Sequence, residues 1–144
     1  MTLNIDFTLS PTSEEIETIY QGLGQFNQKH VPEIDDQAFA FFIRDESGAV
    51  IGGLTGFIYI TSIQIRFLWL SEALRNQGTG RQLIEQVENE AKQRNIPNIA
   101  VDTYTFQAPG FYELCGFDEI GRYKDYLTQG VDKIFYHKRV TNNG

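Results

Sequence analysis

The sequence is poor in several features on which whole classes of protein depend. Cys115 is the single cysteine among 144 residues, so no disulfide can form within the chain and a cytoplasmic location is expected. No apolar run approaches the ~20 residues of a membrane-spanning helix, and the first residues lack the basic-then-apolar pattern of a secretion signal. We therefore expect a protein without a membrane partner.

Basic residues and histidines are also scarce. Lys and Arg number 12 against 19 Asp and Glu, a formal net charge of −7, which argues against a nucleic-acid partner because phosphate backbones bind basic surfaces. The two histidines, His30 and His137, are isolated from one another and from any cysteine or carboxylate cluster. No metal site is expected for this reason.

The hydrophobic pattern predicts a single domain over residues 1–144 with mixed secondary structure. Alternating or continuous apolar segments predict strands over 3–9, 39–44, 50–59, 63–70, 99–104, 117–123 and 134–139. Helical periodicity predicts a helix opened by a capping box at 12–15, a second over 80–95 and a short third over 109–114. The expected class is α/β, a mixed sheet with helices on its faces.

The most informative segment joins the strand over 63–70 to the second helix and reads Arg75-Asn76-Gln77-Gly78-Thr79-Gly80. The first N–H groups of a helix have no partner within it, and the helix dipole adds about half a positive charge there. Such a helix end binds a pyrophosphate well. Gly78 and Gly80 allow close approach of the backbone, and Arg75 could add a charged fork. The alternative is a glycine-rich turn without a ligand.

A second segment, Ala108-Pro-Gly-Phe-Tyr-Glu-Leu-Cys-Gly-Phe117, follows the second helix and the next strand. Together with Leu68-Trp69-Leu70 and the glycine loop, it resembles the GNAT superfamily of acyl-CoA-dependent N-acyltransferases. Those proteins carry an L-x-V-like strand triplet, then [QR]-x-x-G-x-[GA], and later A-x-x-F-Y-x-x-x-G-F. The resemblance covers residues 38–140 and implies a central mixed, mostly antiparallel sheet. That sheet is splayed between its fourth and fifth strands and has helices on both faces.

The resemblance also implies that acetyl-CoA is the co-substrate. The backbone groups of Leu68 and Leu70 would pair with its pantetheine amides, and Trp69 would be either a core aromatic or a wall of the acceptor cleft. The pyrophosphate would lie on the loop and the first helical turn, at Arg75, Asn76, Gln77, Gly78, Thr79, Gly80 and Arg81. Where many family members have an Asn whose side chain contacts the cofactor, this chain has Thr105. The Thr105 hydroxyl would make a smaller contact with the cofactor, which Gln107 could supplement.

The activity that the resemblance implies is transfer of an acetyl group to a primary amine of a small amine, amino acid or peptide. The amine attacks the thioester directly, and the departing thiolate needs a proton. Tyr112 occupies the family's tyrosine position and is the candidate general acid, since a phenol of pKa ~10 is protonated at neutral pH. Alternatively, Tyr112 packs and only hydrogen-bonds the sulfur or a water. The general base stays open among Glu72, Asp102 and Tyr104.

Family members build the acceptor site from the first helix, the loop after it and a late hairpin. Aromatic and acidic residues in these regions would suit a small cationic amine: Tyr20, Phe26, Glu33, Asp35, Asp36, Phe57, Tyr59 and Tyr126. Two other classes stay open, a non-catalytic acyl-CoA-binding sensor and an interaction domain with a structural glycine loop. Dimers are frequent in the family, but no segment of this sequence specifies an interface.

Overall fold

The computed structural model describes residues 2–31 and 36–141, which belong to two compact units. In the first unit, helix α1 (Ser13–Gln28) begins with the predicted capping box. The Thr12 hydroxyl accepts from the Glu15 N–H at 3.1 Å, and the Glu15 carboxylate accepts from the Thr12 N–H at 3.0 Å. The predicted strand over 3–9 is wrong, because no strand forms there. Alternation specifies the two faces of a strand but does not supply a partner for its backbone groups.

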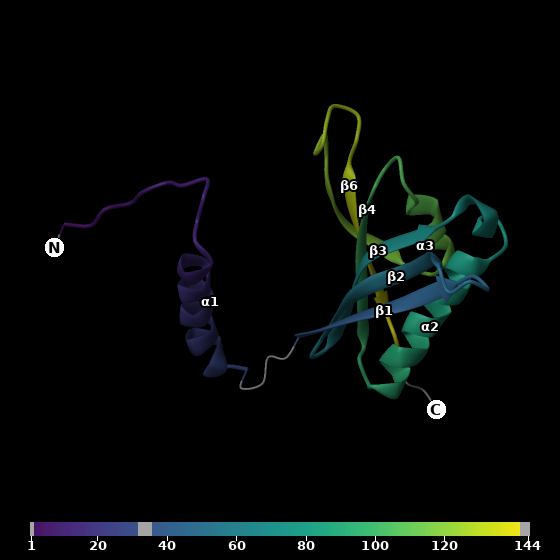
Figure 1. The fold of residues 1–144 in the computed structure, drawn as a ribbon, viewed down its shortest axis with the longest axis horizontal. Helices are drawn as coiled ribbons and strands as arrows, with labels where there is room; N and C mark the ends of the chain where they lie inside the picture. The colour runs from purple at the N-terminus through teal and green to yellow at the C-terminus, as the bar shows by residue number, and fades with distance from the viewer. Residues whose placement is uncertain (1, 32–35, 142–144) are drawn as a thin grey trace. The chain divides into compact units, whose positions relative to one another are not determined.

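The second unit is built on a six-stranded sheet in the order β1-β2-β3-β4-β6-β5 (Figure 1). Its strands are β1 (Asp36–Arg44), β2 (Val50–Tyr59), β3 (Ser62–Leu70), β4 (Asn98–Tyr104), β5 (Asp118–Tyr123) and β6 (Lys133–Arg139). Every neighbouring pair is antiparallel except β3 and β4, which are parallel. The predicted class, a mixed and mostly antiparallel sheet with helices packed on it, is confirmed.

The parallel pair β3–β4 is joined over a short length only. Their register runs from Ser62 opposite Asn98 to Gln64 opposite Ala100, although β3 continues to Leu70 and β4 to Tyr104. Beyond Gln64 the two strands are unpaired with each other. They are the fourth and fifth strands that the sequence predicts, so the expected splay is confirmed.

A β-bulge lies in β3 just after the last parallel pair. On β2, Gly56 pairs with Ile65 while the preceding Thr55 pairs with Phe67, which leaves Arg66 as the extra residue of β3. A bulge of this kind bends the strand and increases its local twist. The bulge therefore coincides with the point where β3 leaves β4.

The hydrophobic core lies on the sheet face that helices α2 (Thr79–Gln93) and α3 (Pro109–Leu114) cover. The apolar stripe predicted for α2 is buried, at Leu83, Ile84, Val87 and Ala91. It packs with strand residues of the same cluster, among them Leu54, Ile63, Ile65, Ile99, Val101 and Ile134. α2 closes where predicted, because Asn95 takes a left-handed φ of 57° and the Ile96 N–H donates to the Ala91 carbonyl at 2.8 Å.

A single turn of 3₁₀ helix, η1 (Glu72–Leu74), connects β3 to the glycine loop and was not evident from the sequence pattern. Among the residues that the structure describes, none of the helices combines the length and the apolarity required to cross a bilayer.

Gly56 gives a stability test of the β2–β3 contact beside the bulge. A Cβ at this position would overlap the Gln64 carbonyl oxygen and lie 2.9 Å from the Phe39 ring. Gly56→Ala should therefore lower the free energy of unfolding by about 1–3 kcal/mol, as overpacking does. The matched control is Gly121→Ala in β5, where a Cβ meets no atom within 4 Å. Urea denaturation of both variants checks this, and equal stabilities would contradict the close approach.

Candidate active site

The open edge of β3 directs backbone groups into the gap that the splay leaves. The Ser71 N–H donates to the Ile51 carbonyl of β2 at 2.9 Å. Because successive residues of a strand direct their peptide groups to opposite edges, Leu68 and Leu70 direct theirs away from β2, toward β4. The Leu70 carbonyl accepts from Arg75 Nε at 3.1 Å. Leu68 and Leu70 are the two residues whose backbone groups, by the family resemblance, would pair with the pantetheine amides.

The start of α2 presents its backbone N–H groups without a side-chain cap. Gly78 is the N-cap residue with a left-handed φ of 78°, and a Cβ there would meet nothing within 4 Å. Conformation rather than space therefore requires glycine at this position. No acidic residue stands in the first turn, so the positive end of the helix dipole is uncompensated there. Free N–H groups and an uncompensated helix dipole are the features of a helix end that binds anions.

The other glycine of the loop has a packing role. A Cβ on Gly80 would lie 3.1 Å from the Phe111 ring of α3. The glycine loop and the tyrosine element, far apart in the sequence, are thus in contact through this position. Gly80 allows α2 to begin directly against α3.

Two side chains of the loop fix its shape. Arg75 is anchored to the end of β3 through Leu70, as above, and Gln77 Nε2 donates to the Ala73 carbonyl at 2.7 Å. Asn76 adopts a left-handed φ of 61°. Arg81 lies in the first turn of α2 in an exposed pair with Glu85 at 3.9 Å. The contacts of this loop with the pyrophosphate stay a prediction. Because the Arg75 and Gln77 side chains are engaged within the loop, we expect backbone N–H groups to make most of these contacts.

The two residues proposed to replace the family's asparagine are engaged in local structure. The Thr105 hydroxyl accepts from the Asp132 N–H at 3.2 Å, and the Thr105 N–H donates to the Asp132 carbonyl at 3.0 Å. Gln107 Oε1 accepts from the Thr103 hydroxyl at 3.1 Å and from the Tyr104 N–H at 3.0 Å. Both side chains thereby hold the turn after β4, and their contact with the cofactor stays a prediction.

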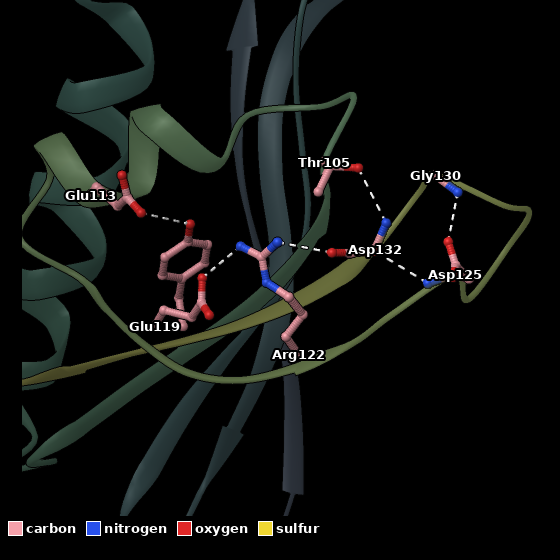
Figure 2. A network of polar contacts seen from close by, with 8 residues as sticks. Thr105, Glu113, Glu119, Arg122, Asp125, Gly130 and Asp132 are labelled. Carbon is pink, nitrogen blue, oxygen red and sulfur yellow. Dashed lines mark hydrogen bonds and ion pairs between the residues drawn. The ribbon is translucent and has the colours of Figure 1, made fainter.

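Thr105 belongs to a polar network that sets the hairpin between β5 and β6 (Figure 2). Arg122 bridges Glu119 at 2.8 Å and Asp132 at 2.9 Å, and the Asp125 N–H donates to Asp132 at 3.1 Å. The Asp125 N–H and the Arg122 guanidinium hold the pKa of the Asp132 carboxyl below its usual value. Apart from Thr105, no motif marks the residues of this network, so sequence reasoning missed Glu119, Arg122, Asp125 and Asp132.

A cleft of about 500 Å³ opens at the splay. Its lining includes Gln64 and Ala100, the last parallel pair, so the cleft begins where pairing ends. Two of the three candidate bases, Asp102 and Tyr104, line it. Glu72 lies in η1, outside the lining.

Three charged residues line this cleft, one each from β3, β4 and β6. Arg66 of the bulge lies over the Phe57 ring at 5.5 Å and the Phe67 ring at 5.4 Å. Lys133 Nζ lies 3.8 Å from the Asp102 carboxylate. The charged lining therefore has two cations and one carboxylate.

The acceptor residues named from the sequence are only partly brought together. Phe57 lines the cleft, and Tyr126 stacks against Tyr104 with ring centroids 6.4 Å apart. Tyr20 and Phe26 belong to the first unit, and Glu33 and Asp35 lie outside the described residues. The remaining two, Asp36 and Tyr59, end the β1–β2 pairing and are outside the lining.

Trp69 is on the sheet face away from the core. Its side chain is 54% exposed, whereas Leu68 and Leu70 on either side pack against the core cluster. Of the two roles expected for Trp69, that of a core aromatic is therefore wrong for the core of the second unit. Trp69 is outside the lining of the cleft, which includes Phe67 instead.

Tyr112 of α3 is buried beside the cleft with an exposed fraction of 6%. Its ring packs against Phe111, Phe117 and Tyr136 at centroid distances of 5.2, 5.8 and 6.0 Å, and Tyr136 lines the cleft. Burial, with smaller contributions from Cys115 and Asp102, raises the pKa of Tyr112 to about 12. The phenol is thus firmly protonated at neutral pH.

Burial also raises the pKa of the Cys115 thiol, which follows Tyr112 at the end of α3. A buried thiol of raised pKa is unreactive, so Cys115 has a packing role. Within residues 2–31 and 36–141, no three His, Cys, Asp or Glu side chains are grouped so as to hold a metal ion.

The raised pKa of Tyr112 predicts a loss of stability in alkali. In the unfolded chain a tyrosine ionises near pH ~10, whereas folded Tyr112 has a pKa of about 12. Between these values the unfolded state releases a proton that the folded state keeps, so the free energy of unfolding falls as pH rises. Below pH ~10 both states are protonated and the effect vanishes.

Urea denaturation of wild type and Tyr112→Phe from pH 8 to 11 measures this contribution. Above pH ~10 the wild type should lose up to about 1.4 kcal/mol more per pH unit than the variant. Parallel curves over the whole range would place the ionisation of folded Tyr112 at the unfolded value.

Comparisons with known proteins agree with this architecture. A model of the acetyltransferase (GNAT) family matches residues 6–117. Acetyltransferase Atu2258 of Agrobacterium fabrum is 30% identical over 119 residues, 81% of this chain and 87% of that protein. Blasticidin-S acetyltransferase of Streptomyces morookaense is 31% identical over 91 residues, 62% of this chain and 67% of that protein.

A crystal structure of an acetyltransferase from Bacillus cereus is similar over nearly its whole length. It is 31% identical, with a TM-score of 0.82, and the match covers 93% of this chain and 97% of that chain. The family model spans well over half of the sequence, and it includes the glycine loop and the tyrosine element. The chain belongs to the acetyltransferase (GNAT) family and is an N-acetyltransferase enzyme.

Proposed function

We propose that this enzyme transfers the acetyl group of acetyl-CoA to the primary amine of a small molecule by direct attack on the thioester. The observation that carries the proposal is the end of β3–β4 pairing after Gln64, which leaves a cleft of about 500 Å³ between the two strands. The volume is in the range of small-molecule sites. The start of α2, which has no side-chain cap, comes shortly after β3 in the chain and lies beyond the end of that strand's pairing with β4.

Recognition of acetyl-CoA would rest mainly on backbone groups. Leu68 and Leu70 offer theirs at the open edge of β3 to the pantetheine amides. The N–H groups at the start of α2, from Gly78 to Arg81, suit the pyrophosphate because helix N-termini attract anions. The Arg75 and Gln77 side chains support this recognition by fixing the loop.

In the reaction, the neutral amine nitrogen forms a bond to the thioester carbonyl carbon, the C–S bond breaks, the nitrogen loses one proton as the amide forms, and the sulfur gains one. Tyr112 would supply that proton, since burial keeps its phenol protonated. The ammonium form of the acceptor must lose a proton first. Asp102 and Tyr104 line the cleft, which favours these two over Glu72 as the group that accepts it.

The anion site at α2 can be tested by adding a negative charge at its first residue. Thr79→Asp should leave folding stability unchanged or slightly higher, because an acidic residue in the first turn is favourable for the helix dipole. The same charge should weaken acetyl-CoA binding about tenfold or more by repelling the pyrophosphate. Thr79→Asn is the uncharged control. Isothermal titration with CoA measures the affinity, and unchanged binding by the acidic variant would contradict this location.

The role of Tyr112 is tested by thiol release from acetyl-CoA with a broad panel of amines. Tyr112→Phe should lower kcat by ~100- to 10,000-fold while acetyl-CoA affinity changes little, because it removes only the proton donor. Tyr123→Phe, which removes an exposed phenol, is the matched control. Full activity of Tyr112→Phe would remove the residue from the mechanism. Acetyl-CoA binding without turnover of any amine would instead indicate a non-catalytic sensor.

A further inference from the structure

We propose that the acceptor is a primary amine that also carries a carboxylate, and that Arg66 binds the carboxylate. The inference rests on the proposed acetyl transfer and names the chemical class of its second substrate. Arg66 lines the cleft as the extra residue of the β3 bulge.

Among the described residues, no carboxylate is paired with the Arg66 guanidinium. The group lies instead over the Phe57 and Phe67 rings, at 5.5 and 5.4 Å. A guanidinium stacked on rings keeps its N–H edge available, and that edge matches a carboxylate in a two-point hydrogen bond.

The other charges of the cleft complete the pattern. Lys133 is paired with Asp102 at 3.8 Å, so the two cations and one carboxylate of the lining leave one positive charge unmatched. An acceptor with a carboxylate supplies the missing anion. Its amine can then reach Asp102 or Tyr104, which lie on β4 across the splay from Arg66.

Aromatic side chains line the remainder of the cleft and favour an apolar or planar body between the two polar ends. They come from β2, β3, β4 and β6, at Phe57, Phe67, Tyr104, Phe135 and Tyr136. A simple dication, by contrast, would bring further positive charge to a lining that already has an excess. The favoured class is therefore an amino acid or another amine with an acidic group.

The experiment compares matched acceptors that differ only in the acidic group. The pairs are 4-aminomethylbenzoate with benzylamine, phenylalanine with phenethylamine, and γ-aminobutyrate with propylamine, with the phosphonate analogue of 4-aminomethylbenzoate as a further arm. Initial rates give kcat/KM for each, and titration into the CoA-bound enzyme gives the affinity without turnover. We expect the carboxylate member of at least one pair to exceed its partner about ten- to a hundredfold.

Variants at Arg66 and at a control arginine test whether Arg66 is the origin of the preference for a carboxylate. Arg66→Gln should reduce the ratio of kcat/KM within a pair toward one, mainly through KM, and Arg66→Lys should restore it in part because charge returns without the fork. The matched control is Arg44→Gln. Arg44 also lies over a phenylalanine ring, Phe42 at 5.2 Å, but outside the cleft lining. Thermal unfolding confirms that each variant is folded.

Equal rates and affinities within every pair would overturn the inference, and so would a ratio that Arg66→Gln leaves unchanged. A preference for the phosphonate over the carboxylate would overturn the assignment of the acidic group. These outcomes are distinct from failure of the proposed function. That failure would appear as no binding of acetyl-CoA, or as no acetylation of any of the amines, with or without the carboxylate.

Discussion

Backbone hydrogen bonding constrains this molecule more than any other interaction. A peptide group that is buried without a partner costs about 1–3 kcal/mol, so strands in the middle of a sheet normally pair along their whole length. β3 and β4 pair over three residues and then separate. The separation is stable because the core face holds both strands through residues such as Ile65 and Val101, while the open edges face a cleft. The unpaired edge of β3 can therefore be reserved for a ligand.

The bulge at Arg66 accounts for two properties of the site at once. It bends β3 at the point where pairing with β4 ends, and it inserts an arginine there, in the wall of the cleft. Gly56 on β2 supports this geometry, since a side chain at that position would overlap the Gln64 carbonyl. The shape of the cleft and its excess positive charge thus have a common local origin.

Those parts of the molecule that depend on local sequence were predictable. The glycine loop, the stripe of α2 and the short helix that carries Tyr112 lie where their residue patterns place them, and the family resemblance supplied the splay. The charged lining of the cleft was not predictable, because Arg66 and Lys133 lie on strands that only the sheet register brings together. The local hydrogen bonds of Thr105 and Gln107 were not predictable for a similar reason. Their partners depend on how the turn after β4 meets the β5–β6 hairpin.

In the binding mode proposed here, different kinds of group would recognise the two substrates, and this difference would affect how acceptor specificity can change. Acetyl-CoA would be bound through the backbone of β3 and of the start of α2, which substitutions of side chains alter little. The acceptor would meet side chains, of which Arg66 depends on a bulge and Lys133 on a hairpin. Lys133 directly follows Asp132, and the contacts of Asp132 with Arg122 and Thr105 hold that hairpin. Partly exposed ion pairs of this kind add little stability. These contacts hold the residue directly before Lys133, whose Nζ lies 3.8 Å from the Asp102 carboxylate. On this proposal, changes in a few hairpin residues would alter the preferred acceptor without weakening the binding of acetyl-CoA.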